Sequence, residues 1–178
     1  MAIIIVWQLP YKRTNAMMRN LLLPLVLFPA FAQAASASPA PTAAAVVRGF
    51  LDEVRSGRAP EKTVNYLAPE VRAHQVTAEG ESVVVRSPEA YARHVQEFRQ
   101  LFGDFSFTIQ EFISDEDKVF VRWRQDGHHL GSLDGETPTG APLTELTSVV
   151  YRVEAGKIAE YWLQTDRKGL ELQLQRAK

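Results

Sequence analysis

Apolar residues recur at helical spacing in the first part of the chain beyond residue 42. They fall three and four residues apart, as on the buried face of a helix, at Val47, Phe50, Leu51 and Val54. Thr42 can cap such a helix and Gly57 can end it. A shorter helix is expected after Pro60, with Val64 and Leu67 buried.

A second apolar stripe follows the segment Ser87-Pro88-Glu89, which combines a capping hydroxyl, a proline at the first helical position and an acidic first turn. The stripe consists of Tyr91, Val95, Phe98 and Phe102. Gly103 ends the predicted helix. We expect His94, which has charged neighbours, to lie on the surface of this helix.

Beyond Gly103 the period changes to two, which is the pattern of strands with one buried face. The predicted strands are 105–109, 119–123, 142–153 and 158–166, with shorter pieces at 71–74 and 82–86. Short turns join the four long strands, so they form an antiparallel meander. Helices followed by such strands predict an α+β fold, in which N-terminal helices cover a cone-shaped, curved antiparallel sheet.

The first 40 residues have a different character. Arg19 precedes the apolar run Leu21–Phe31, and the small-residue segment Ala32-Gln33-Ala34 follows it, which is the order of a secretory signal peptide. The run carries two prolines and is shorter than the roughly 20 apolar residues that span a membrane.

We therefore expect residues 1–34 to be a cleaved signal peptide, with translation starting at Met17 or Met18. Residues 35–42 form a small-residue linker, and residues 43–178 form the domain. The protein is then periplasmic or secreted and keeps no stable membrane anchor. An uncleaved N-terminal anchor is the alternative.

Composition narrows the function classes. The chain has 178 residues, a formal net charge of -1 and no cysteine. No Lys/Arg-rich run provides the basic surface that nucleic-acid binding requires, so we expect no nucleic-acid partner. Without cysteine there is neither a disulfide framework nor a thiolate metal site, and the two adjacent histidines lack clustered acids, so no metal site is expected.

Strand parity places candidate site residues together. If the pairing of the second long strand continues far enough, one face carries Trp123, Gln125 and His129. In the last strand the same rule groups Trp162, Gln164 and Asp166. Parity puts Phe120 and Tyr161 on the opposite face.

These residues predict a pocket with an apolar wall and a proton-transfer group. The wall would consist of Trp123, Trp162, Phe98 and Phe102. His129 and Asp166 are the candidate acid and base, and shielding against indole rings would raise the pKa of the Asp166 carboxyl. Asp166 at a solvated strand end, and tryptophans that belong only to the core, are the alternatives.

Several segments resemble the SnoaL-like polyketide and ester cyclase branch of the nuclear transport factor 2-like superfamily. They are Ala68–Val71, Gly127–Gly131, Gly135–Gly140, Tyr151–Trp162 and Asp166–Leu170. The resemblance extends from Val46 to Leu174 and implies a cone-shaped sheet with a buried pocket.

The resemblance also implies roles for particular residues. Asp166 lies where this family has its acid/base carboxylate, four residues after the tryptophan of the last strand, and His129 and His74 lie where members tend to have histidines. Val149 departs from the polar group that cyclases often carry at this position. A homodimer is also implied.

Two functions are consistent with these features. The first is a cofactor-free cyclase, isomerase or dehydratase-like enzyme, in which Asp166 moves a proton on a small apolar carbonyl compound and His129 or His74 polarises the carbonyl. The second is a non-catalytic periplasmic domain that binds an apolar metabolite in the same pocket.

Overall fold

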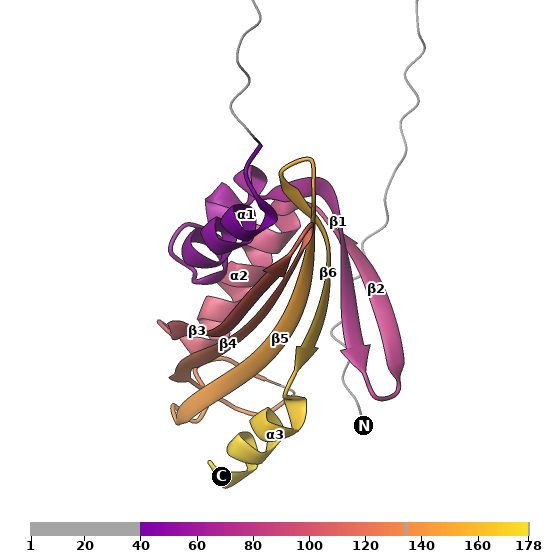
Figure 1. The fold of residues 1–178 in the computed structure, drawn as a ribbon. Coiled ribbons are helices and arrows are strands. Elements are labelled where there is room, and N and C mark those ends of the chain that lie inside the picture. Colours follow the sequence, from indigo (N-terminus) through magenta and orange to yellow (C-terminus); the bar gives the residue numbers. More distant parts are fainter. Residues whose placement is uncertain (1–39, 134, 178) are drawn as a thin grey trace, which may run out of the picture. The chain divides into compact units, whose positions relative to one another are not determined.

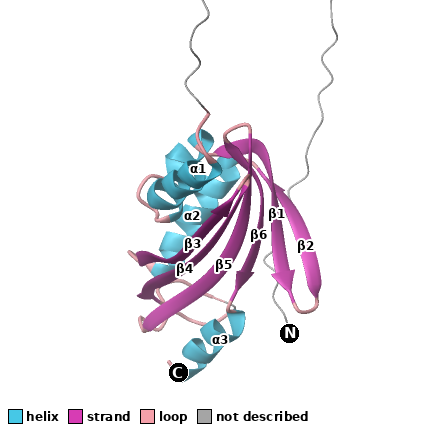
Figure 2. Ribbon diagram, in the orientation of Figure 1, coloured by secondary structure: helices cyan, strands magenta, loops and turns pink. Residues whose placement is uncertain are grey.

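The computed structural model describes residues 40–133 and 135–177, and the expected signal peptide and most of the linker lie outside them. The helical elements are α1 (Ala43–Phe50), the π-helical turn η1 (Leu51–Arg55), the 3-10 helix η2 (Pro60–Asn65), α2 (Pro88–Phe102) and α3 (Arg167–Arg176). The strands are β1 (Leu67–Thr77), β2 (Gly80–Arg86), β3 (Ser106–Asp115), β4 (Lys118–His128), β5 (Pro142–Glu154) and β6 (Lys157–Thr165). Figure 2 shows the helices gathered on one side of the curved sheet, with α3 beyond its end.

The predicted helix boundaries are confirmed by their caps. The Thr42 hydroxyl oxygen accepts a hydrogen bond from the Ala45 N–H, and the Ser87 hydroxyl oxygen accepts one from the Ala90 N–H, both at 3.2 Å. Gly103 ends α2 with φ at 70°, a conformation that favours glycine.

One mixed sheet contains all six strands, in the order β2-β1-β6-β5-β4-β3 (Figure 1). The four long strands form the predicted antiparallel meander, and the α+β fold is confirmed. The predicted strand pieces at 71–74 and 82–86 form the longer β1–β2 hairpin, and β1 pairs with β6 in parallel. Sequence analysis missed this parallel pairing because its partners are about 90 residues apart.

The main core lies between the helices and one face of the sheet, which we call the inner face. Phe50 of α1 is fully buried, and its ring centroid lies 5.3 Å from that of Tyr91 and 5.8 Å from that of Tyr151. Near the other end of the sheet, Gly127 lets α2 approach β4, because a Cβ at this position would lie only 2.5 Å from the carbonyl oxygen of Phe102. We call the opposite face the outer face.

An irregularity in β6 reverses the parity predicted for that strand. Ile158 pairs with Val153, but Glu160 pairs with Arg152, so Ala159 is an extra residue between two ladder pairs. Beyond this bulge the odd-numbered residues face inward. Tyr161 is therefore buried on the inner face, 5.9 Å from Tyr151 between ring centroids, and its predicted place on the outer face is wrong.

Two other predictions of local structure are wrong. Val64 is 58% exposed on η2, and Leu67 is buried as the first residue of β1 rather than as part of a helix. The segment that follows β6 forms α3.

Among the described residues, no helix is long and apolar enough to span a membrane.

Candidate functional site

A group of polar and aromatic side chains lies buried on the inner face, and we call it the inner polar cluster. Its members are Arg55 of η1, Trp123 and Gln125 of β4, and Glu145 and Thr147 of β5. Register explains how the strands bring them together, because Trp123 pairs with Thr147 and Gln125 pairs with Glu145. Gln125 is 0% exposed and Arg55 is 5% exposed, although both are strongly polar.

Arg55 is the centre of this cluster. One guanidinium nitrogen, Nη2, donates a hydrogen bond of 2.6 Å to the Gln125 side-chain oxygen and lies 3.5 Å from a Glu145 carboxylate oxygen. The guanidinium carbon lies 4.8 Å from the centroid of the Phe98 ring and 5.3 Å from that of the Trp123 ring. Arg55 is thus held by aromatic faces and by a neutral amide as well as by a carboxylate.

Glu145 is the ionisable carboxyl of the cluster. Burial raises its pKa above the ordinary value, and the positive charge of Arg55 and the hydrogen bond from the Thr147 hydroxyl oppose this effect only in part. A carboxyl with a raised pKa, next to a positive group and away from water, is suited to take up and release a proton.

Several N–H groups near Glu145 have no hydrogen-bond partner within the described part of the chain. They are Nη1 of Arg55, Nε1 of Trp123 and Nε2 of Gln125. An unpaired buried donor costs about 1–3 kcal/mol, so these groups call for acceptor oxygens from a molecule other than the protein.

A hollow in the protein surface lies close to the cluster. It has a volume of about 490 Å³, is open to solvent and lies between the end of η1 and the start of β3. Ser56, the residue after Arg55, and Phe107 are among its lining residues. The Phe107 ring lies 5.7 Å from that of Trp123, so Phe107 borders both the hollow and the cluster.

His94 of α2 is a further titratable group beside this cluster. Its side chain is half-buried, and its ring lies 6.0 Å from that of Tyr91. Burial lowers the pKa of His94 to about 3, and the positive charges of Arg86 and Arg55 add to the effect. The expected surface position of His94 is wrong, and the ring is neutral at physiological pH.

The structure brings some of the predicted site residues together. Trp123 and Gln125 lie on the inner face, and Phe98 contacts Arg55. Phe102 stacks on Phe98 with ring centroids 4.2 Å apart. His129 is 1% exposed just beyond β4, with Nδ1 3.2 Å from the Thr139 hydroxyl oxygen and Nε2 without a partner among the described residues.

Asp166 lies elsewhere, and its predicted shielding against indole rings is wrong. The side chain is exposed, and its Oδ1 accepts a hydrogen bond of 2.8 Å from the Gly169 N–H, so Asp166 caps α3. Gln164 is likewise exposed on the outer face, because the Ala159 bulge reverses the strand's parity.

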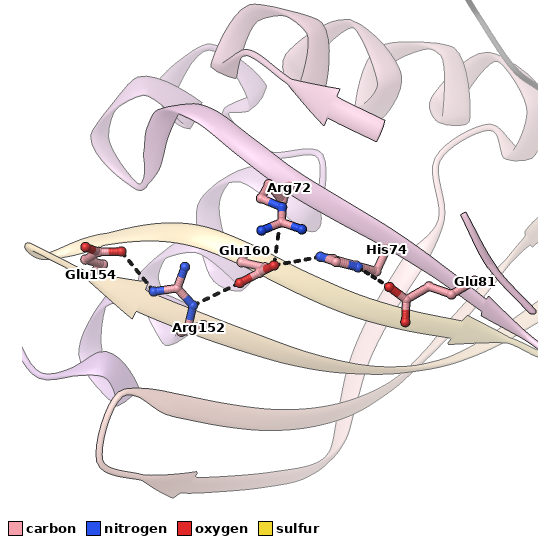
Figure 3. Close-up of polar contacts among 6 residues, drawn as sticks. All are labelled: Arg72, His74, Glu81, Arg152, Glu154 and Glu160. Atoms are coloured by element: carbon pink, nitrogen blue, oxygen red, sulfur yellow. Dashed lines mark hydrogen bonds and ion pairs between the residues drawn. The ribbon is translucent and has the colours of Figure 1, made fainter. Parts of the chain in front are cut away.

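The predicted place of Trp162 in the same pocket wall as Trp123 is wrong, because the Ala159 bulge turns Trp162 to the outer face. There it stacks on His74 with ring centroids 4.9 Å apart. Figure 3 shows His74 between two carboxylates, with Nε2 2.7 Å from an oxygen of Glu160 and Nδ1 2.5 Å from an oxygen of Glu81. Burial alone would raise the pKa of Glu160, but its hydrogen bonds with His74 and Arg152 hold that pKa below the ordinary value. This network is thus separate from the inner polar cluster.

Comparison with known proteins identifies the family. Residues 45–174 match the family model for SnoaL-like polyketide cyclases. The chain belongs to the SnoaL-like polyketide cyclase family. The fold of this family is that of small-molecule-binding cyclases and isomerases. No curated protein sequence matches at a significant level.

Solved structures agree with this assignment. A proposed polyketide cyclase from Acidithiobacillus ferrooxidans is 26% identical, with a TM-score of 0.67 over 79% of this chain and 99% of that chain. Wild-type IdmH, a proposed polyketide cyclase from Streptomyces antibioticus, is also 26% identical, with a TM-score of 0.62 over 75% of this chain and 98% of that chain. A SnoaL-like protein from Jannaschia, 17% identical over 77% of this chain and 94% of that chain with a TM-score of 0.65, shares the fold.

Sequence reasoning missed Arg55, Glu145, Thr147 and His94 of this SnoaL-like chain. Parity along 142–153 does place Glu145 and Thr147 on the face of the buried Val149 and Tyr151. Arg55 follows Leu51 by four residues and so falls on the apolar helical face. Among the described residues, no cluster of three or more His, Cys, Asp or Glu side chains could hold a metal ion.

The low pKa of His94 makes stability dependent on pH in a defined direction. As the pH falls below about 6.5, the unfolded chain binds a proton at residue 94 that the folded protein does not bind until about pH 3. Stability is therefore lost as the pH falls through this window. His94→Gln, which does not titrate, should remove about 1–3 kcal/mol of the loss between pH 7 and pH 4.

Urea unfolding at a series of pH values measures this difference. The matched control is His128→Gln, which changes an exposed histidine at the end of β4 and leaves His94 in place. Its stability should depend on pH as that of the wild type does. The same pH dependence in His94→Gln and in the wild type would contradict the assignment.

Proposed function

We propose that this protein is a cofactor-free acid–base catalyst of the cyclase or isomerase type that acts on a small, mostly apolar carbonyl compound. The observation that carries the proposal is the largely buried carboxyl of Glu145, which lies next to Arg55 and among N–H groups that have no acceptor in residues 40–133 and 135–177. Family membership supports this class of chemistry.

The proposed reaction begins with transfer of a proton from the carbon next to a carbonyl to the Glu145 carboxylate. The C–H electron pair moves into the carbon–carbon bond, and negative charge collects on the carbonyl oxygen as an enolate. The unpartnered N–H groups of Arg55, Trp123 and Gln125 are suited to stabilise that charge. In an isomerase the proton returns to another carbon. In a cyclase the enolate carbon forms a bond to a second carbonyl carbon, whose oxygen takes the proton.

Glu145 suits this role better than Asp166 does. Asp166 is exposed, and its carboxylate already accepts a backbone hydrogen bond as the cap of α3. Catalysis by Asp166, with His129 or His74 as partner, stays a prediction that the same experiment tests.

Exchange of carbon-bound protons measures the proposed step directly. The protein is incubated with 2-tetralone, a bicyclic ketone, in D₂O, and incorporation of deuterium next to the carbonyl is followed by NMR. Wild type should accelerate the exchange over buffer, and Glu145→Gln should lower the rate on the order of 100-fold, because a positioned base contributes about that much. Asp166→Asn should retain the activity.

Each alternative gives a different result. A loss of exchange activity confined to Asp166→Asn would assign the role of the catalytic base to Asp166. Binding of 2-tetralone without acceleration would favour the non-catalytic binding domain, for which the N–H groups of Trp123 and Gln125 would hold the ligand. No acceleration by the wild type, or an unchanged rate in Glu145→Gln, would contradict the proposal.

We also propose that the protein is exported to the periplasm or secreted. The support is the order of Arg19, the apolar run and Ala32-Gln33-Ala34 in the sequence. The full chain, expressed with a C-terminal tag in a Gram-negative host, should be recovered outside the cytoplasm with Ala35 as its first residue, as measured by intact mass. Ala34→Arg should block the cleavage, and an unprocessed wild-type chain would contradict the proposal.

We further propose a homodimer formed through the outer face. Its support is a row of mostly apolar residues that are paired across neighbouring strands. The row runs through Ile113, Phe120, Val150, Trp162, His74 and Val83. Ile113 is 62% exposed and Val83 is 47% exposed, so the row ends in open apolar surface.

Sedimentation velocity tests the dimer. The wild type should sediment as a dimer, and Ile113→Lys should shift it to the monomer by placing a charge in the interface. Val64→Lys changes a similarly exposed valine on η2 and should leave the dimer intact. A wild type that sediments only as a monomer would contradict the proposal.

A further inference from the structure

The buried polar atoms that lack partners share one chemical property. All those found among the described residues are nitrogens, on Arg55, Arg86, Trp123, Gln125 and His129. Four of these nitrogens carry hydrogen under all ordinary conditions, and only the imidazole nitrogen of His129 can serve as an acceptor. Those of Arg55, Trp123 and Gln125 belong to the inner polar cluster, which therefore favours an occupant that offers acceptor oxygens.

The charge of Arg55 is incompletely matched by the protein. Its distance to Glu145 is 3.5 Å, whereas charge-assisted hydrogen bonds between such groups measure about 2.7–2.9 Å. The shortest contact of Arg55 is with the neutral Gln125 amide. Arg86 adds a second cation, since its charge and that of Arg55 both lower the pKa of His94, whereas Glu145 is the one carboxyl that contacts Arg55 among the described residues. Positive charge thus exceeds negative charge around the cluster.

The walls beside Arg55 are flat and apolar. Phe98 and Trp123 each present a ring to the guanidinium, and Phe107 continues the aromatic surface from Trp123 toward the open hollow. Ring systems pack well on such surfaces. The free nitrogen of Arg55, Nη1, lies on the same guanidinium that both of these rings contact.

We infer that the inner polar cluster binds its ligand through an anionic oxygen, a carboxylate or an ionised enol, carried on a flat apolar ring system, with Nη1 of Arg55 as the charge partner. Nε1 of Trp123 and Nε2 of Gln125 donate to neighbouring oxygens of the same ligand. The inference rests on the proposed function in that it assigns the ligand of the same site. It concerns the charge of that ligand, which proton transfer by Glu145 does not determine.

Matched pairs of anionic and neutral probes test this selection. For a carboxylate the pair is 2-naphthoate and methyl 2-naphthoate. For an ionised enol the pair is 2-hydroxy-1,4-naphthoquinone, which is ionised at neutral pH, and 2-methoxy-1,4-naphthoquinone. Titration calorimetry at pH 7.5 gives the dissociation constants. We expect at least one anion to bind about tenfold or more tightly than its neutral partner, and the pair that shows the difference identifies the source of the charge.

Variants locate the selection at Arg55. Arg55→Met should reduce the anion-to-neutral ratio to about one, whereas Arg93→Met, which removes an exposed arginine of α2 that does not line the hollow, should keep the wild-type ratio. If Arg55→Met does not fold, the double variant Arg55→Met/Glu145→Gln removes both charges of the pair and should show the same loss of preference. Circular dichroism checks the folding of each variant.

The inference is overturned if the wild type binds both neutral probes as tightly as their anions. It is also overturned if the preference survives in the folded Arg55 variants or disappears in Arg93→Met. The probes are tested by binding alone, so a preference for anions without proton exchange would contradict the proposed function and leave this inference standing. Proton exchange without a preference for anions would support the proposed function and contradict this inference.

Discussion

A guanidinium buried against a sheet constrains the rest of this structure, because a charged group inside a protein must be given partners from several directions. Arg55 obtains an amide oxygen from β4, a carboxylate from β5, and ring faces from α2 and β4. The π-helical turn at the end of the first helix places it there. The registers of β4 and β5 then set Gln125 opposite Glu145, so that both partners meet the same guanidinium.

The same constraint explains why the site is rich in donors. One nitrogen of Arg55 donates to Gln125, and another has no acceptor in the part of the chain that the structure describes. Replacement of the cluster by apolar residues of similar volume could preserve or increase stability, since buried ion pairs are weak sources of stability. The presence of polar groups at these positions is therefore better explained by what they bind than by what they stabilise.

Much of the fold could be predicted from the sequence because local chemistry determines it. The capping hydroxyls of Thr42 and Ser87 and the change from helical to alternating periodicity near Gly103 define the helices and the meander. Pairing between strands that are distant in sequence leaves no local signal, and the pairing of β1 with β6 was therefore missed. The single extra residue at Ala159 was missed as well, and it is sufficient to exchange Tyr161 and Trp162 between the faces.

The candidate site could be predicted only in part, for related reasons. The regular register of β4 placed Trp123 and Gln125 on the inner face as predicted, and His129, just beyond the strand, is buried. Parity counted through a bulge led to Asp166, whereas the uninterrupted stretch of β5 that pairs with β4 would have led to Glu145. His94 was placed on the surface because its polarity outweighed its position between Tyr91 and Phe98 on the buried face of α2. A hydrophobic pattern predicts that polar residues lie on the surface, so it fails for the polar residues that lie in the interior.

The parallel pairing of β1 with β6 affects the order in which the strands of the sheet can pair. β1 has β2 as its antiparallel partner, but its other edge remains open until β6, translated about 80 residues later, is available. Contacts so distant in sequence are slow to form. Until β6 is available, the β1–β2 hairpin therefore has one strand edge without a partner, and such an edge is a surface on which another chain could pair.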